Sequence, residues 1–187
     1  MNKFVLKPTS IEGLKVIERL PIRDERGSFE RFFCQESLGQ FMGGKTIRQI
    51  NRTLTQKKGT VRGLHFQYSP YAETKIVTCL KGKVWDVAVD LRQGSRTFLH
   101  YHEVLLTDKN NKSFLIPEGF AHGFQTLTIN CEMIYIHNAD YHKESEGSVN
   151  ALDPALKIKW PTAITYRSQR DKTHLFLKKD FKGIHIQ

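Results

Sequence analysis

Short apolar runs separated by turn residues dominate the second half of the chain. The run IVTCL, residues 76–80, is followed by Lys81-Gly82-Lys83 and then by VWDVAVDL, residues 84–91. This pattern predicts a β-hairpin with its turn at Gly82. Side-chain alternation in the second arm predicts two faces, one of Trp85, Val87, Val89 and Leu91, the other of Val84, Asp86, Ala88 and Asp90.

Three later stretches also have the length of strands and are bounded by Gly, Pro, Asn or Asp: TFLHYHEVLL, SFLIPEGF and EMIYIHNADY. Helical periodicity is weak and is confined to Glu36–Met42 and to short pieces after Ser168. This distribution argues against a doubly wound α/β fold and favours an all-β sandwich or barrel. A barrel of this kind has a concave mouth in which a ligand can bind.

The length of 187 residues suits a single domain spanning residues 1–187. No apolar stretch has the length of a signal-peptide core or of a membrane span, so we expect a cytoplasmic protein that does not enter the membrane. The three cysteines, Cys34, Cys79 and Cys131, lie far apart and include no C-x-x-C pair. They indicate neither a zinc site nor a disulfide framework, and we expect buried thiols.

The formal net charge of +10 favours anionic partners. The 29 Lys and Arg residues are scattered, however, and no recognition helix, RNP-like stretch or Cys/His finger is present. We therefore expect no nucleic-acid partner. A phosphate-bearing small molecule fits the charge equally well, although most of the lysines suit a solubilising surface.

Four stretches place unusual polar residues beside glycine or inside apolar strands: DERGSFERFF, QINRTLTQKKGTVRGLHFQ, PEGFAHGF and IYIHNADYHKESEG. Buried Arg, His and Tyr cost free energy unless they are paired, so such residues form structural networks or functional sites. Judged one at a time, these residues have structural explanations. His65 and Tyr135 could be hydrogen-bonded core residues, Arg62 could form an ion pair inside the barrel, and Arg26 could be a turn residue. Alternation in Val61–Gln67 predicts one face of Val61, Gly63, His65 and Gln67 and an opposite face of Arg62, Leu64 and Phe66.

Barrels of this type often hold a metal ion through an H-x-H pair, a Glu and a later His, so the sequence could contain a metal site. The stretch PEGFAHGF, with His122, is similar to the second of the two metal motifs. The first motif lacks its pair, because Gln67 stands two residues after His65. His100 and His102 do form H-x-H, but the adjacent Glu103 points to the opposite face. We therefore expect no metal and no cofactor.

Together these motifs resemble the dTDP-4-dehydrorhamnose 3,5-epimerases and their relatives that act on other nucleotide sugars. The match runs from about Gly13 to Asp171 through DERGSF, QINRTL, GTVRGLHFQ, Lys75, GKVWDVAVDLR, IPEGFAHGF, ESEG, DPALKIKWP and SQRD. The resemblance implies a cupin-like double-stranded β-helix, or jelly-roll barrel, with short flanking helices. It also implies a nucleotide-diphosphate sugar as substrate, metal-free proton transfer, and a homodimer whose N-terminal strands reach across to the partner sheet.

The resemblance also implies roles for individual residues. His65 would be the general base, Asp171 its orienting carboxylate and Tyr135 the general acid. Lys75 would lie near the sugar carbonyl, with His122 beside it. The positions that match residues holding the sugar, the diphosphate or the base are Arg26, Gln49, Asn51, Arg62, Tyr141, Glu146 and Arg170.

These residue types suit epimerisation next to a ketone. A ketone at C4 acidifies the hydrogens on C3 and C5, and a neutral imidazole, which titrates near pH 6.5, can accept such a proton. The ammonium of Lys75 can stabilise the enolate that forms. Alternation in MIYIH predicts that Met133, Tyr135 and His137 share one face, as a cavity wall requires.

One departure from the family pattern leaves the substrate open. Many relatives that act on thymidine substrates carry an acidic residue five places after the arginine of DERG, and here that position is Arg31. We count Arg31 among the substrate-binding residues. Because its charge is opposite to that of the usual acidic residue, the identity of the nucleotide stays open between dTDP, CDP and GDP. Inversion at C3, at C5 or at both also stays open. A non-catalytic sugar-nucleotide-binding barrel is the alternative from another class, against which the intact base, acid, lysine and carboxylate speak.

Overall fold

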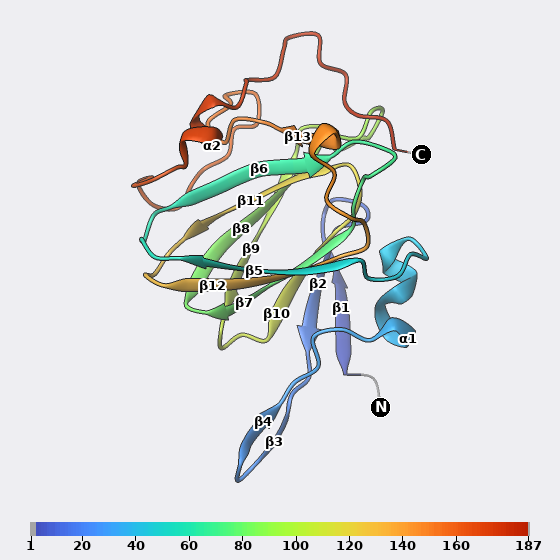
Figure 1. Cartoon of the computed structure of the whole chain (residues 1–187), viewed down its shortest axis with the longest axis vertical. Helices are drawn as coiled ribbons and strands as arrows, with labels where there is room; N and C mark the ends of the chain where they lie inside the picture. Colours follow the sequence, from blue (N-terminus) through green and yellow to red (C-terminus); the bar gives the residue numbers. More distant parts are fainter. Residues whose placement is uncertain (1–2, 187) are drawn as a thin grey trace.

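The computed structural model describes residues 3–186, and most of its regular structure is β-strand (Figure 1). The strands are β1 (Phe4–Pro8), β2 (Lys15–Arg19), β3 (Ile22–Asp24), β4 (Gly27–Phe29), β5 (Gln49–Thr55), β6 (Val61–Gln67), β7 (Lys75–Lys81), β8 (Lys83–Asp90), β9 (Tyr101–Thr107), β10 (Lys112–Ile116), β11 (Phe120–Thr126), β12 (Cys131–His137) and β13 (Glu146–Ser148). The helices are α1 (Gln35–Leu38) and α2 (Gln169–Thr173), with 3-10 turns η1 (Gly39–Met42) and η2 (Lys143–Ser145).

Two antiparallel sheets form the body of the molecule. The first has the order β1-β2-β10-β7-β12-β5 and the second the order β13-β6-β11-β8-β9. The sheets face each other across a shared interior and enclose it as a barrel (Figure 1). This is the jelly-roll arrangement, so the expected all-β, cupin-like barrel with short flanking helices is confirmed.

Three apolar clusters hold the layers together. The first lies between the sheets and takes side chains from both, among them Phe114 of β10 and Phe124 of β11. The second covers the outer side of the second sheet with residues of the C-terminal segment, such as Leu156 and Ile184. The third packs α1 and η1 against β2, β7 and β12.

Strand β8 follows the predicted alternation, and both of its faces are buried. Val84 and Ala88 enter the cluster between the sheets, whereas Val87, Val89 and Leu91 enter the outer cluster under the C-terminal segment. The charge of Asp86 therefore lies on the face that looks into the barrel.

The predicted hairpin around Gly82 is wrong. Strand β7 pairs with β10 and β12, while β8 pairs with β9 and β11, so the two consecutive strands belong to different sheets. The tight turn itself is present, and Gly82 has a φ of 84°, which favours glycine. In a jelly roll such a turn carries the chain from one sheet to the other, and apolar runs on both sides of a turn cannot distinguish the two outcomes.

The predicted alternation of β6 is also wrong. Between its pairs with β11, His65↔His122 and Arg62↔Phe124, β6 contains one residue more than its partner, which is a β-bulge. The bulge lies at Gly63, whose φ is 121°. As a result Val61, Leu64 and Phe66 share the outer cluster, and Arg62 and His65, predicted on opposite faces, both turn toward the barrel mouth.

The short helices lie where periodicity indicated them, with α1 and η1 covering Gln35–Met42 and α2 following Ser168. The stretch SFLIPEGF, expected as one strand, is divided: β10 ends at Ile116, and β11 begins at Phe120 after a turn that contains Gly119. None of the helices within residues 3–186 has the length and apolar character of a membrane span.

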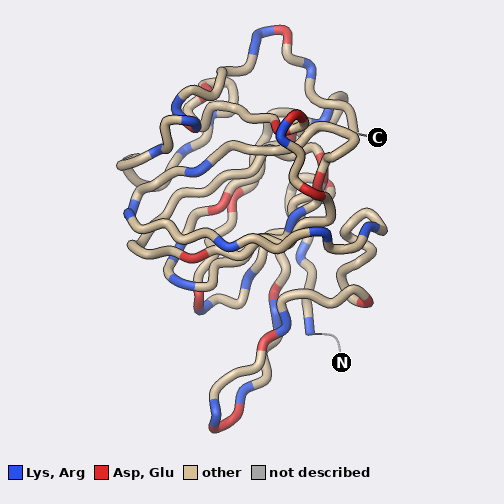
Figure 2. Tube along the Cα trace, in the orientation of Figure 1, with Lys and Arg blue, Asp and Glu red and all other residues tan. Residues whose placement is uncertain are grey.

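A hairpin of β3 and β4 projects from the barrel beside β1 and β2 (Figure 1). All six of its strand residues are exposed. Basic and acidic residues are spread over both sheets and the loops, without a single basic face in the view of Figure 2. We call the segment Ile22–Phe29 the arm.

Candidate active site

The barrel mouth contains a pocket of about 330 Å³ between the two sheets. Strands of the first sheet contribute Asn51, Thr53, Lys75, Tyr135 and His137. The second sheet and α2 contribute Arg62, His65, His122, Arg170 and Asp171. The pocket thus collects titratable side chains from segments that are far apart in the sequence.

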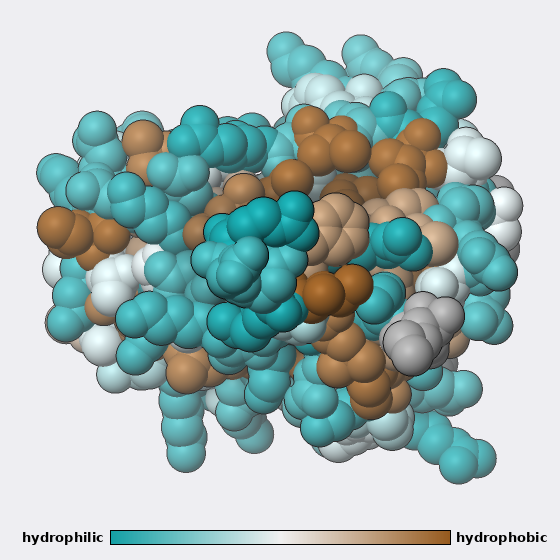
Figure 3. Space-filling model, turned by 90° about the horizontal axis from the view of Figure 1, so that it is seen from below, coloured by the Kyte–Doolittle hydropathy of each residue, from teal (hydrophilic) through white to brown (hydrophobic). Residues whose placement is uncertain are grey.

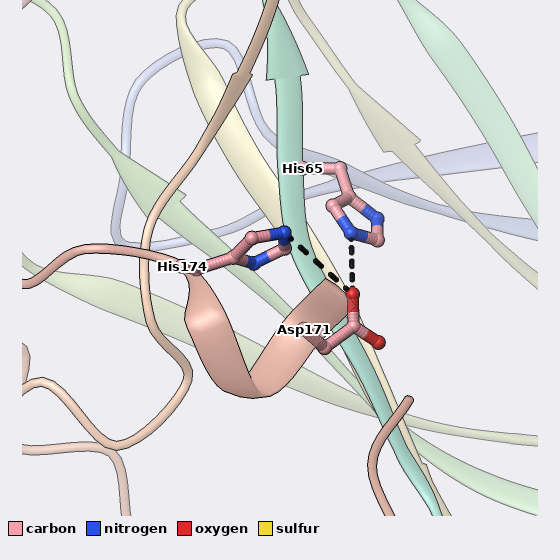
Figure 4. A group of neighbouring side chains, drawn as sticks. All are labelled: His65, Asp171 and His174. Atoms are coloured by element: carbon pink, nitrogen blue, oxygen red, sulfur yellow. Dashed lines mark hydrogen bonds and ion pairs between the residues drawn. The ribbon is translucent and has the colours of Figure 1, made fainter. Parts of the chain in front are cut away.

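His65 and Asp171 form a hydrogen-bonded pair on one wall of this pocket (Figure 4). The distance from Nε2 of His65 to Oδ1 of Asp171 is 2.9 Å. Helix α2 presents the carboxylate because the Ser168 hydroxyl caps the helix and accepts a hydrogen bond from the Asp171 backbone nitrogen at 3.0 Å. The arrangement is that of a general base held by a carboxylate.

Asp171 is ionised in this setting. Burial alone would raise the pKa of its carboxyl, but the hydrogen bond and charge of His65 and the hydroxyl of Ser168 outweigh burial, and the pKa lies below its usual value. An ionised carboxylate stabilises an imidazolium that forms beside it. The pair is therefore suited to taking up a proton from a ligand in the pocket.

His174 lies behind the pair, with Nε2 3.8 Å from Oδ1 of Asp171, and points toward it (Figure 4). The ligand atoms of His65, Asp171 and His174 lie within 4.8 Å of one another, and within residues 3–186 no other group of His, Cys, Asp and Glu is this close. His100 and His102 belong to no such group. A metal ion bound among these atoms would replace the hydrogen bond by which Asp171 holds Nε2 of His65.

Tyr135 stands on the other sheet, facing the pocket from β12. Burial raises the pKa of its phenol, so the hydroxyl keeps its proton at physiological pH. Its oxygen lies 3.4 Å from the Thr53 hydroxyl, and its ring meets the His122 ring edge-on at 6.1 Å between centroids. Met133, Tyr135 and His137 share one face, as the alternation predicted. Tyr135 and His137 line the pocket, and Met133 lies deeper in the same interior.

Lys75 reaches the pocket from the first residue of β7 and is buried. Its ammonium lies 2.6 Å from Oε1 of Glu73. The other oxygen of Glu73 lies 2.8 Å from Nδ1 of His137. A positive charge thus faces the interior beside the acid and the base.

His122 pairs with a second carboxylate, that of Asp86. The distance from Nε2 of His122 to Oδ1 of Asp86 is 2.9 Å, and both side chains are buried. Burial raises the pKa of the Asp86 carboxyl, and the charge and hydrogen bond of His122 act against this. His122 is therefore held rigidly next to Lys75 and Tyr135.

Arg62 has no acidic partner within residues 3–186. Its Nε donates to the Thr55 hydroxyl at 2.9 Å, and one terminal nitrogen donates to the Leu54 carbonyl at 3.4 Å. The ion pair that would make Arg62 purely structural is absent from this part of the chain. Its remaining donors are available to an anionic group.

A second pocket of about 350 Å³ adjoins the first and shares Asn51, His65, Glu73 and His137 with it. Its lining also includes Gln49, Phe66, Gln67, Tyr141 and Glu146. The Tyr141 hydroxyl donates to Glu146 at 3.0 Å, and Glu146 also pairs with Arg170. The two pockets together accommodate a ligand with a reacting end and an extended end.

The comparisons with known proteins agree with this geometry. The sequence profile of dTDP-4-dehydrorhamnose 3,5-epimerase matches residues 8–179. The chain belongs to this family. A curated dTDP-4-dehydrorhamnose 3,5-epimerase of Sinorhizobium fredii is 35% identical over 92% of this chain and 89% of its own length.

Two further relatives show the range of the family. The dTDP-6-deoxy-D-glucose-3,5-epimerase of Legionella pneumophila, solved in complex with dTDP-4-keto-L-rhamnose, superposes with a TM-score of 0.90 at 37% identity, covering 98% of this chain and 99% of its own. The dTDP-4-dehydrorhamnose 3-epimerase of Streptomyces niveus is 34% identical over 92% of this chain and 83% of its own length.

Most residues that the family resemblance indicated line these two pockets. They are Gln49, Asn51, Arg62, His65, Lys75, His122, Tyr135, Tyr141, Glu146, Arg170 and Asp171. Arg26 and Arg31 line neither pocket. Arg26 lies in the exposed turn of the arm and pairs with Asp24, as its turn position suggested, and Arg31 is exposed just after the arm.

The sequence left four residues in or behind the pocket unrecognised: Thr53, Glu73 and Ser168 line it, and Asp86 lies behind it against His122. Asp86 carried a usable signal, because a carboxylate between apolar neighbours in a buried strand needs a partner. Glu73 carried none, since its contact with His137 joins a loop to a strand more than sixty residues away.

A larger hollow of about 830 Å³ lies beside the C-terminal segment and is lined by Arg92, Arg96 and Ile184, among others. Arg92 is already paired with the buried Asp90, and the hollow contains neither the base nor the acid described above. The epimerase family's chemistry therefore belongs to the pockets between the sheets.

Proposed function

We propose that this protein is an epimerase that inverts C3, C5 or both in a nucleotide-linked 4-keto-6-deoxy sugar. The principal candidate reaction converts dTDP-4-keto-6-deoxyglucose to dTDP-4-keto-L-rhamnose. The observation that carries the proposal is the position of two groups in one pocket. His65 of the second sheet, paired with Asp171 of α2, and the protonated Tyr135 of the first sheet both line it. Inversion needs two such groups on opposite sides of the sugar ring.

In the proposed mechanism His65 takes a proton from the carbon next to the C4 ketone. The C–H electrons move to the carbonyl oxygen and form an enolate, and Asp171 stabilises the resulting imidazolium. Lys75 and His122 stabilise the enolate oxygen. Tyr135 then gives its proton to the opposite face of the same carbon, and solvent restores both groups.

Substrate binding is assigned to the rest of the two pockets. Arg62 and Arg170 are assigned to the diphosphate, because one guanidinium group can donate two parallel hydrogen bonds to phosphate oxygens. Gln49, Asn51 and Glu146 suit the sugar hydroxyls. Tyr141, about half exposed at the outer pocket, suits stacking on the base.

Deuterium exchange tests this function. The protein is incubated in heavy water with dTDP-4-keto-6-deoxyglucose and, separately, with its CDP and GDP counterparts, and entry of deuterium at C3 and C5 is followed by NMR. Exchange at both carbons with the dTDP sugar indicates a 3,5-epimerase, and exchange at one carbon a single-centre epimerase. Exchange only with a CDP or GDP sugar would support the alternative raised by Arg31. No exchange with any of the three would support the non-catalytic binding barrel.

We further propose that the active form is a homodimer in which the arm completes the partner's pocket. The arm exposes Ile22 at 49% and Phe29 at 62%, an apolar surface that a second copy can cover. Seen from the arm's end, hydrophobic side chains surround its base (Figure 3). This arrangement would bring Arg26 and Arg31 to a substrate that they do not reach within their own chain.

Subunit complementation tests the arm's role. Arg26→Ala and His65→Asn should each reduce turnover, and mixed dimers of the two variants should regain activity, because one of their two sites then has both residues. If Arg26 acts within its own chain, the mixture will gain nothing. A monomeric mass in solution would also contradict the dimer.

The three cysteines are free thiols, which suits a reducing compartment. Together with the nucleotide-sugar substrate, this supports our placing the enzyme in the cytoplasm.

A further inference from the structure

Two buried titratable residues of the pocket, Glu73 and His137, have no role in the mechanism above. Both line the two adjoining pockets. Glu73 lies in the loop before β7, two residues from Lys75, and its carboxylate bridges Lys75 and His137 at 2.6 and 2.8 Å. A carboxylate only accepts hydrogen bonds, so Nδ1 of His137 is the nitrogen that carries the hydrogen.

Sheet register explains why these groups meet. Strand β12 lies between β5 and β7, and His137 stands opposite Gln49 on one side and Lys75 on the other. Side chains in one such row point to the same face of a sheet. Asn138 fixes the loop through its side chain, which accepts from the Thr74 nitrogen at 2.7 Å. Glu73 is thereby held in front of the row.

The three side chains are nearly closed off from solvent, with exposures of 9% for Glu73, 6% for Lys75 and 9% for His137. A buried ammonium without a counter-charge tends to lose its proton. Burial would raise the pKa of Glu73, but the charges and hydrogen bonds of Lys75 and His137 outweigh it and hold the pKa well below its usual value. Glu73 is therefore ionised and keeps a compensating charge next to Lys75.

We propose that Glu73 is a positioning residue that keeps Lys75 charged and aimed at the enolate oxygen, and that His137 in turn holds Glu73. This inference rests on the proposed epimerase function. Charge that stabilises an enolate has its full effect only when it is fixed before the reaction. A lysine on a flexible four-carbon stem needs such an anchor more than a planar guanidinium does.

Variants separate the anchor's position from its charge. Glu73→Ala removes both and should lower kcat for deuterium exchange by roughly tenfold to a hundredfold, with KM nearly unchanged. Glu73→Gln keeps an acceptor for Lys75 without the charge. It should retain much of kcat at neutral pH, while the alkaline limb of its pH–rate profile moves to lower pH because Lys75 loses its proton more easily.

His137 is tested in the same way. His137→Gln keeps a donor to Glu73 and should retain most of kcat, whereas His137→Phe should lose several-fold. The matched control is Glu132→Gln, on the same strand as His137 but outside the pocket. It breaks the 2.7 Å ion pair of Glu132 with Arg52 of β5. This control should leave kcat, KM and the pH profile unchanged.

Failure of the inference is distinct from failure of the function. If the wild-type protein exchanges no deuterium with any nucleotide sugar, the proposed function itself is wrong. If the wild type exchanges and Glu73→Ala, with an unchanged melting temperature, matches its kcat and pH profile, the inference is overturned. Should Glu73→Ala fail to fold, a wild-type pH profile in the near-isosteric Glu73→Gln would overturn it equally.

Discussion

Two histidine–aspartate pairs lie in the same barrel with the same Nε2–Oδ1 distance but in different surroundings. His65–Asp171 and His122–Asp86 both have an Nε2–Oδ1 distance of 2.9 Å. The His65 side chain is 35% exposed, at the pocket, whereas His122 is 6% and Asp86 0% exposed. The pKa is lowered in Asp171 and raised in Asp86. The same Nε2–Oδ1 distance thus occurs with opposite pKa shifts, because burial outweighs the histidine at Asp86, whereas His65 and Ser168 outweigh burial at Asp171.

The origin of the two carboxylates accounts for this difference. His65 and His122 are opposite each other on neighbouring strands β6 and β11. Asp171 comes from the capped end of α2 at the barrel mouth, while Asp86 comes from the interior face of β8. In the proposed function the outer pair exchanges a proton with the ligand, and the inner pair fixes a wall of the site.

The largest effect is expected from removing the base. His65→Asn should lower kcat by about 10²- to 10⁴-fold, the contribution usual for a positioned general base. Binding of dTDP, measured by calorimetry, should change little, because His65 acts on the sugar carbon. Wild-type turnover in this variant would remove His65 from the mechanism.

The same substitution in the two pairs sharpens the contrast. Asp171→Asn should lower kcat by about 10²- to 10³-fold, since an amide neither stabilises the imidazolium nor holds the required tautomer. Asp86→Asn should lower kcat by less than about tenfold, because the amide keeps a hydrogen bond to His122 without a buried charge. Steady-state kinetics on both variants would contradict this account if the inner substitution proved the more damaging.

A smaller difference is expected in acid stability. The pKa of Asp171 is lowered in the folded protein, so its contribution to stability is complete above the ordinary carboxyl pKa of about 3.9 and is lost as the pH falls below it. Thermal unfolding of Asp171→Asn should therefore depend less steeply on pH between about 5 and 2 than that of the wild type. Equal slopes would mean that the pair adds nothing to folding.

No loss of rate is expected from removing metal ions. The proposed mechanism uses His65, Asp171, Tyr135 and Lys75 and needs no metal ion, so dialysis against EDTA should leave the deuterium exchange rate unchanged. Activity that disappears on dialysis and returns with one added metal ion would show that the His65, Asp171 and His174 group works as a metal centre.

The sequence predicts the regular parts of this protein well. Alternation in β8 and β12 places each side chain correctly because neither strand contains an extra residue: the shift between β12 and β7 at Glu132 and Met133 adds its residue to β7. It fails in β6, where the bulge at Gly63 brings Arg62 and His65 to the same side. It also fails at Gly82, because a local pattern does not reveal whether a turn stays within one sheet.

The site depends on contacts that no local pattern contains. His65 and Asp171 are 106 residues apart, and only the family resemblance connected them in the sequence. Glu73 was missed because its bridge between Lys75 and His137 appears only when β7 and β12 are paired. Arg26 and Arg31 lie outside the pockets of their own chain, so their predicted role depends on a second copy.

The central claim is that removal and return of the proton belong to two different groups on opposite sheets. The most direct test is Tyr135→Phe incubated with dTDP-4-keto-6-deoxyglucose in heavy water, with deuterium entry and configuration both read by NMR. The account predicts that His65 still exchanges the hydrogen while inversion is lost, because no donor remains on the far face. Inversion at the wild-type rate in this variant would contradict the account.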